Sequence, residues 1–131
     1  MDKADRDVLD EFGEKVIREV RDDACHFIQR VISGQMQDRT SAQYFGEYER
    51  LDAASASVLH HFLAAAVDAC LVRFLHFLEV NDIEVLYRKS TGPDRVNICA
   101  ISDGLAGEIH NEQGWIARFS EFKDRIEPSA E

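Results

Sequence analysis

Residues 53–78 read AASASVLHHFLAAAVDACLVRFLHFL, the longest apolar run in the chain. Asp68 and Arg73 are its only charged residues, and apolar residues fall on nearly every side of its helical projection. A helix with this pattern is normally covered by neighbours on all sides. At a rise of 1.5 Å per residue it would extend about 39 Å, the width of a small domain. The sequence therefore predicts a buried central helix over residues 53–78.

The composition predicts one acidic, soluble domain over residues 1–131. The chain has 131 residues, of which 45% are hydrophobic, so it can bury a substantial core. Its formal net charge of −10 argues against binding to nucleic acid or to an anionic membrane by bulk attraction. The same charge would favour encounter with a basic protein, although a charged surface also serves solubility.

The N-terminus and the cysteines predict a cytoplasmic protein. Residues 1–7 are mostly charged and lack the apolar run and the cleavage site of a signal peptide. The run over residues 53–78 contains Asp68, Arg73 and three histidines, so we expect it not to span a membrane. The three cysteines show no CxxC spacing, which favours buried free thiols in a reducing cytoplasm over disulfides or a zinc site. They are Cys25, Cys70 and Cys99.

Amphipathic patterns predict helices before the central one. Over residues 5–33, apolar residues recur at three- and four-residue steps, and Gly34 follows as a candidate C-cap. A shorter pattern starts at Thr40, a candidate N-cap. It reads either as part of one kinked helix or as a short helix that leads into the long one. We favour two pieces, with Ser55 or Ser57 as the cap of the long helix.

The second half of the chain predicts a hairpin and a last helix. Ile83–Arg88 and Arg95–Ile101 read as two strands on either side of a turn at Ser90–Asp94. Residues 114–125 carry an apolar stripe that begins at Trp115 and predicts a C-terminal helix. The expected fold class is therefore α+β and mostly helical, with a long helix pair or bundle, one β-hairpin and a C-terminal helix.

Asp68 is the most unusual residue of the central run. It lies among alanines, and no cation stands three or four residues away. A buried carboxylate without a partner is very costly, so it needs one from elsewhere in the chain. Arg73, Tyr44, Tyr48 and Trp115 are the candidates. We expect Asp68 to be a structural polar hub; an interface charge pair and a catalytic role are the alternatives.

The histidines do not predict a metal site. His60 and His61 are adjacent and so point about 100° apart on a helix. Asp23–His26 and His76–Glu79 have the i,i+3 spacing of metal sites in helix bundles, but the matching second set of glutamates is missing. We therefore predict no metal ligand, no cofactor and no catalytic residue.

The segments Ile101–Ile109 (ISDGLAGEI) and Gly114–Ser120 (GWIARFS) are the most distinctive part of the chain. They resemble the C-terminal portion of small acidic bacterial proteins, some of which are similar to immunity proteins of polymorphic toxin systems. That resemblance implies a non-enzymatic protein that binds and blocks a toxin domain, and the negative charge would suit a basic toxin. The alternative is that Trp115 and Phe119 only pack the last helix against the hairpin.

These observations together predict a cytoplasmic, protein-binding domain. Two acidic surfaces are its candidate contact surfaces, one on the first helix and one in the segment after the hairpin. Their residues are Glu14, Glu19, Asp22 and Asp23, and Asp103, Glu108 and Glu112. One alternative is a homodimer in which a second copy covers part of the central helix. Another is a small metal- or ligand-binding enzyme that uses His60, His61, Asp68 or His76.

Overall fold

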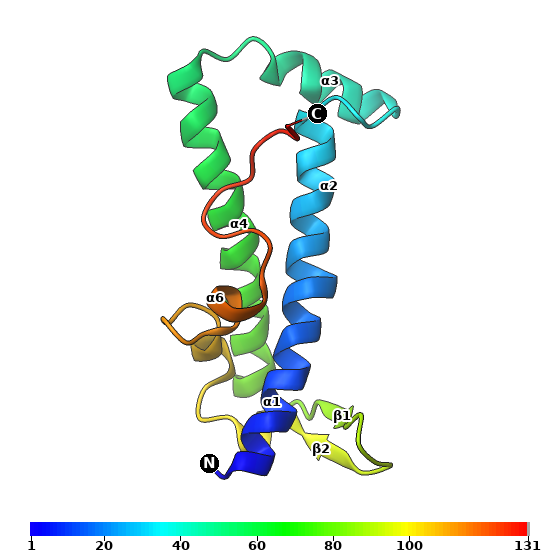
Figure 1. The fold of residues 1–131 in the computed structure, drawn as a ribbon, viewed down its shortest axis with the longest axis vertical. Coiled ribbons are helices and arrows are strands. Elements are labelled where there is room, and N and C mark those ends of the chain that lie inside the picture. The colour runs from blue at the N-terminus through cyan, green and yellow to red at the C-terminus, as the bar shows by residue number, and fades with distance from the viewer. Residues whose placement is uncertain (131) are drawn as a thin grey trace.

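Two long antiparallel helical rods form the frame of the molecule (Figure 1). The computed structural model describes residues 1–130, and with 62% helix and one two-stranded hairpin the fold is α+β and mostly helical, as predicted. Its elements are α1 (Lys3–Val16), η1 (Ile17–Arg21), α2 (Asp22–Ile32), α3 (Arg39–Tyr48), α4 (Ala53–Val80), β1 (Leu86–Arg88), β2 (Arg95–Asn97), α5 (Ile98–Ile101), η2 (Leu105–Glu108) and α6 (Trp115–Phe119).

The first rod runs without a break through α1, η1 and α2. Asp2 caps its start by accepting a hydrogen bond from the backbone N–H of Asp5 at 2.8 Å. Gly34 follows its end with φ of 74° and donates its N–H to the carbonyl of Val31. This left-handed conformation favours glycine, so the predicted C-cap is confirmed.

A π turn, η1, interrupts the first rod in its middle. The N–H of Asp22 bonds to the carbonyl of Ile17, five residues back, and this widens the turn. Arg21 and Asp22 are both buried directly after the widening. The π turn thus allows two adjacent charged residues to face the interior from a helix whose next turns are amphipathic.

Helices α3 and α4 are separate pieces, as predicted, but other residues cap them. Asp38 caps α3 through the N–H of Ser41, and Asp52 caps α4 through the N–H of Ser55. The predictions of Thr40, Ser55 or Ser57 as caps are wrong. A carboxylate placed three residues before an N–H satisfies the same unpaired donor of the first turn.

The β-hairpin is shorter than predicted. β1 and β2 pair antiparallel with Tyr87 opposite Val96. The predicted second strand should have continued to Ile101, but Ile98–Ile101 instead forms the single turn α5. Asn97 causes this change because its side-chain oxygen accepts the N–H of Cys99 at 3.2 Å and so caps a helical turn.

The predicted C-terminal helix over residues 114–125 ends early, at Phe119. Residues 120–130, which we call the strap, run in an extended path along one side of α2 and α4 (Figure 1). Ile126 of the strap is fully buried, and its N–H donates to the carbonyl of His60 at 3.0 Å. Contacts with the two rods therefore replace the last turns of the predicted helix.

The prediction that α4 is covered on all sides is wrong. α4 is one unbroken helix, but its fully buried residues share a single side. They are Ala64, Asp68, Leu71 and Leu75. Val58, Phe62 and Phe74 are exposed. The apolar character of a helix does not reveal which of its sides has a neighbour in the same chain.

The core consists of two clusters along the helix pair. The lower core centres on Trp115, which lies against Gly13 so closely that a Cβ there would come within 2.1 Å of the indole. Its buried members are Val8, Leu9, Ile17, Leu71, Leu75, Ile98, Leu105, Ile109, Trp115 and Ile116. The smaller upper core comprises Cys25, Ile32, Ala64 and Ile126.

Candidate protein-binding face

A buried ion pair joins the two rods between the lower and upper cores. Arg21 donates from Nε to one carboxylate oxygen of Asp68 at 2.6 Å and from Nη2 to the other at 3.3 Å. Arg21 is the partner of Asp68, so none of the candidates that we considered from the sequence (Arg73, Tyr44, Tyr48 and Trp115) is. Sequence spacing could not reveal Arg21, because it lies 47 residues away on the other rod.

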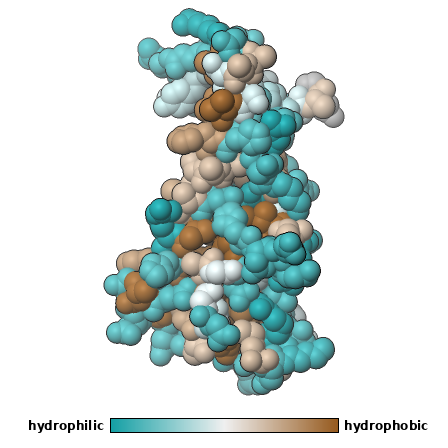
Figure 2. Space-filling model, turned by 90° about the vertical axis from the view of Figure 1, so that its left-hand side faces the viewer, coloured by the Kyte–Doolittle hydropathy of each residue, from teal (hydrophilic) through white to brown (hydrophobic). Residues whose placement is uncertain are grey.

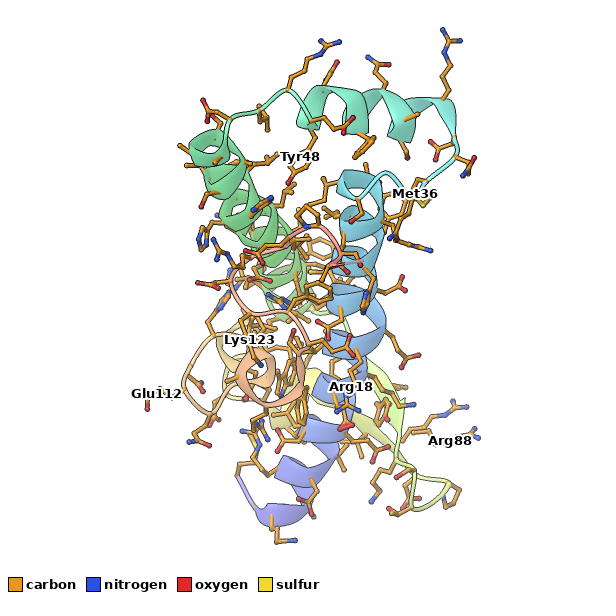
Figure 3. The ribbon with its side chains drawn as sticks, turned by 45° about the horizontal axis from the view of Figure 1, so that its top comes forward. Arg18, Met36, Tyr48, Arg88, Glu112 and Lys123 are labelled. Atoms are coloured by element: carbon orange, nitrogen blue, oxygen red, sulfur yellow. The ribbon has the colours of Figure 1, made fainter. Side chains whose placement is uncertain are left out.

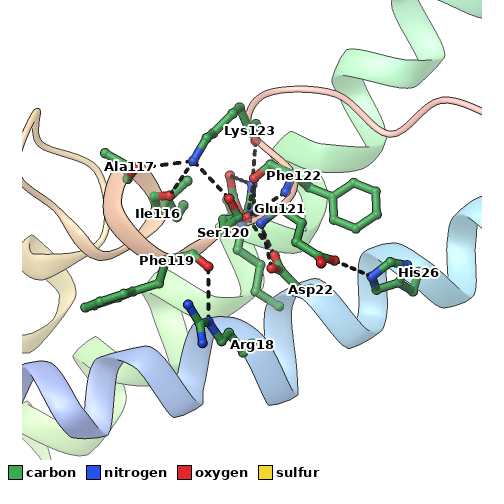
Figure 4. Close-up of polar contacts among 12 residues, drawn as sticks. Arg18, Asp22, His26, Ile116, Ala117, Phe119, Ser120, Glu121, Phe122 and Lys123 are labelled. Atoms are coloured by element: carbon green, nitrogen blue, oxygen red, sulfur yellow. Dashed lines mark hydrogen bonds and ion pairs between the residues drawn. The ribbon is translucent and has the colours of Figure 1, made fainter.

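The same arginine holds the strap on one side of the helix pair. Its remaining donors bond to the hydroxyl of Ser120 and to the carbonyls of Phe122 and Lys123. Asp22 accepts from the Ser120 hydroxyl at 2.6 Å and from the N–H of Glu121 at 2.8 Å (Figure 4). These contacts fix the start of the strap and leave Asp22 unavailable to any partner protein.

The opposite side of the helix pair has no such cover. On α2 the strap contacts Asp22, His26, Gln29 and Ser33. Apolar residues occupy the opposite side at helical spacing. We call this surface the open face and define it by Val20, Ala24, Phe27 and Val31 of the first rod and Leu59, Leu63, Ala66, Cys70 and Phe74 of α4, together with Phe77, whose ring stacks on that of Phe74.

Large apolar side chains of the open face are about half exposed. Val20 is 56% exposed, Phe27 46%, Phe74 57% and Phe77 49%. Single exposed apolar residues are normal on protein surfaces, but a contiguous group of this kind marks an interaction site. Figure 2, which faces the α4 side of the molecule, also shows apolar groups among the polar ones on that adjacent side.

Two apolar grooves hollow the open face. The upper groove lies between α2, α3 and α4 and has a volume of about 520 Å³. Besides residues of the open face, Tyr44, Tyr48 and Leu51 line it. The lower groove, of about 500 Å³, lies between the middle of the first rod and α4. Small-molecule pockets of this size normally contain several convergent polar groups. These grooves are almost entirely apolar, so they are better suited to contact with a protein partner than to binding a small molecule.

The acidic residues that we predicted as contacts are scattered over the molecule. Glu108 is half-buried and paired with Arg6 at 2.8 Å, and Glu14 lies 3.5 Å from Arg18. Glu19 and Asp23 are exposed on the first rod. Asp103 and Glu112 are exposed in loops, and Figure 3 shows Glu112 at an outer edge of the molecule. The seven residues therefore do not form one surface, and buried Asp22 contributes to none.

Three of the five histidines bond to neighbours in other parts of the chain. His60 lies 2.6 Å from the hydroxyl of Tyr48, between α3 and α4 (Figure 3). His26 lies 2.7 Å from Glu121, and His61 contacts the carbonyl of Asp124. Within residues 1–130, no three histidine, cysteine or acidic side chains are gathered closely enough to hold a metal ion.

The three thiols differ in accessibility. Burial raises the pKa of the Cys25 thiol to about 11 and also raises the pKa of Cys99. Cys70 is exposed on the open face and Cys99 is partly exposed, so the prediction of buried thiols is correct only for Cys25. A reagent that attacks the thiolate should therefore react first with Cys70, which makes this residue a reporter of whether the face is covered.

Helix α4 is also long and apolar enough to cross a membrane by length and composition alone. Only 22% of its most apolar window is buried. Asp68 of this helix is paired with Arg21 of the first rod, so insertion would carry a charged pair and the attached strap into hydrocarbon. The composition of α4 is thus compatible with a membrane span, whereas its buried ion pair and the strap attached to it argue against one.

Comparison with known proteins adds no function. No protein-family model, no curated protein and no solved structure matches this chain. The open face was missed by sequence reasoning because that reasoning assumed that every side of residues 53–78 would be buried. The signal that could have revealed it is the second apolar stripe of the first rod, at Val20, Ala24, Phe27 and Val31.

Proposed function

We propose that this chain is a non-enzymatic protein-binding domain and that the open face is its binding surface. The observation that carries the proposal is the asymmetry of the helix pair. One side is covered by the strap and fixed by hydrogen bonds, whereas the other exposes Phe27, Phe74 and Phe77 beside two apolar grooves. Burial of aromatic side chains of this kind dominates the energy of most interfaces.

The chemistry of the face indicates a partner with an apolar surface. Among the residues that line the lower groove, Arg21 alone is charged, and its donors are already bonded inside the protein. In the upper groove, Glu47 alone is charged. A partner selected for positive charge would find few acceptors here. We therefore infer recognition by apolar packing, with charge acting only at the rim.

A reducing, cytoplasmic setting fits this proposal. All three cysteines are free, and the exposed Cys70 lies on the binding surface itself. In an oxidising compartment a thiol at this place would be open to unwanted disulfide formation.

Occlusion of a basic toxin domain is the second candidate function. It is supported by the net charge and by Asp103 and Glu112, which are exposed and have no ion-pair partner within residues 1–130. These two residues lie outside the open face. Binding through them should weaken steeply as salt is added, whereas binding through the open face should change little.

Site-specific photocrosslinking in the cells that make the protein tests the main proposal. Benzoylphenylalanine in place of Phe74 should give a covalent adduct with a protein. The same group in place of Thr91, exposed in the hairpin turn, should give none and serves as the matched control. An adduct with lipid alone, or no adduct at Phe74, would refute the proposal. Protein adducts from Asp103 but not from Phe74 would favour the toxin alternative.

A further inference from the structure

We infer that the partner on the open face is a second copy of this chain, an inference that rests on the proposed function. In this homodimer the open faces of two copies pack against each other and bury both pairs of grooves. The two-fold axis runs parallel to α2 and α4, so that α2 of each copy lies on α4 of the other.

The apolar area of the face matches what a homodimer needs. Phe27, Phe74 and Phe77 are each about half exposed, which leaves roughly 300 Å² of aromatic surface. Val20 of the open face, with Leu51 and Tyr44 of its upper groove, raises the total to about 500 Å². A standard interface buries about 800 Å² per partner, of which about 65% is apolar in homodimers, or about 520 Å². The face therefore has the apolar content of one complete dimer interface.

Two copies stacked by their open faces form a complete four-helix bundle. The helix pair is an antiparallel two-helix layer with one covered side (Figure 1). Stacking two such layers by their uncovered sides gives a four-helix bundle in which every adjacent helix is antiparallel. A two-fold axis uses the same patch on both copies, so this interface is complete at two copies.

The charges at the rim select this direction of the axis. Glu19 and Arg73 are both exposed. At about 100° per residue, Glu19 lies about 160° round its helix from inward-facing Arg21, and Arg73 about 140° round from Asp68, which puts both on outer edges. Counted from the Arg21–Asp68 contact at about 1.5 Å per residue, the two lie within about 5 Å of the same height along the antiparallel pair. An axis parallel to the helices brings Glu19 of one copy toward Arg73 of the other. An axis across the helices would instead set first rod against first rod and bring the acidic edges together. Because the whole chain carries a charge of −10, the mostly uncharged grooves also limit repulsion at the centre of the dimer.

Sedimentation velocity of the purified chain, from submicromolar to submillimolar concentration, tests the inference. We expect a shift to twice the monomer mass of 14.9 kDa. Phe74→Asp should weaken the dimer by roughly 30-fold or more, the effect of a central hot-spot residue. Val58→Asp is the matched control, because Val58 is exposed on the same helix but lines neither groove, and it should leave the dimer unchanged.

A charge swap tests the direction of the axis. Glu19→Arg and Arg73→Glu should each weaken the dimer, and the two substitutions together should restore it. Circular dichroism should show unchanged helix content in these variants and in those at Phe74 and Val58, since all four positions are exposed.

Three results would overturn the inference: a strict monomer at all concentrations, a dimer insensitive to Phe74→Asp, or a swap that restores nothing. A strict monomer whose Phe74 position still crosslinks to another protein in cells would remove the homodimer and leave the proposed function standing. A dimer of the predicted kind would also slow maleimide labelling of Cys70 as concentration rises.

Discussion

Arg21 is the residue on which the assembly of the rods and the strap depends. All five N–H donors of its guanidinium find acceptors: two on Asp68, one on Ser120 and two on strap carbonyls. A buried guanidinium is tolerated when all of its hydrogen-bond donors are bonded, because each unpaired donor in the interior is costly. Loss of Asp68 would therefore leave two donors of Arg21 unpaired inside the protein. Asp22, whose carboxylate lies 3.5 Å from Nη1, would be the only anion left beside the buried guanidinium.

We expect Asp68→Ala to lower the free energy of unfolding by about 3 kcal/mol, the lower end of the usual cost of removing one partner of a buried ion pair, because Asp22 still lies beside Arg21. Urea denaturation followed by circular dichroism measures this change. Asp103→Ala is the matched control: Asp103 is exposed, so its loss should change stability by no more than about 0.5 kcal/mol. A cost below about 1 kcal/mol for Asp68→Ala would contradict the role assigned to the pair.

The burial of Asp68 could be anticipated from its alanine-rich neighbours, but its partner could not. Arg21 is the last residue of the π turn, and the extra residue in that turn places it facing inward. Regular helical spacing from the sequence alone does not locate such a turn, since it arises from packing rather than from local residue preference.

At the level of elements, the hairpin depends on one carboxylate of α1. Glu11 accepts from the hydroxyl of Tyr87 at 2.7 Å and from the N–H and hydroxyl of Ser90. Phe12 packs edge-to-face on Tyr87 at 5.8 Å. A two-stranded hairpin is marginal in water, so these contacts hold it on the first rod. Hydrogen bonds from Tyr87 and Ser90 lower the pKa of Glu11 below its ordinary value of 4.5.

We predict that Glu11→Gln destabilises the protein at neutral pH and that the difference from the unchanged chain disappears in acid. The pKa of Glu11 is lower in the folded than in the unfolded state. Its stabilising contribution is thus present above pH 4.5 and is lost as pH falls through the lowered value. Urea denaturation at a series of pH values measures the free energy of unfolding of the unchanged chain and of the variant. Glu84→Gln, an exposed residue of the same region, should show no such dependence. A difference in unfolding free energy between the unchanged chain and Glu11→Gln that stays constant with pH would show that the charge of Glu11 does not stabilise the hairpin.

Patterns in the sequence predicted most elements but misjudged where two of them end. The first rod, the α3–α4 break and the hairpin follow from apolar periodicity and turn residues. The C-terminal helix stops at Phe119 because Ser120 and Glu121 bond to Asp22. The second strand stops at Asn97 because that side chain caps the next turn. Both endings depend on side-chain hydrogen bonds that compete with regular structure, and one depends on a distant residue.

For the molecule as a whole, the error about the central helix is informative. Residues 53–78 contain more apolar surface than the remainder of this chain covers, which composition could not reveal. The strap and η2 cover one side, and the open face remains. A small domain has a limited number of elements with which to cover a long apolar helix. The apolar surface that stays exposed at Phe74 and Phe77 is the surface that a partner would bury.

The two cores should also differ in stability, because the upper one has four buried residues and the lower one ten. We expect the upper core to open before the molecule unfolds. Cys25 reports this opening, since burial raises its pKa to about 11 and shields it, while Trp115, the single tryptophan, reports the lower core. The measurement uses a variant with Cys70→Ser and Cys99→Ser, which leave Cys25 as the one thiol, and with Phe74→Asp, which keeps the chain monomeric. In this variant, thiol labelling in increasing urea gives the free energy of opening at Cys25. It should be smaller than the unfolding free energy from tryptophan fluorescence. Equal values would mean that both cores and the Arg21–Asp68 pair between them unfold as one unit.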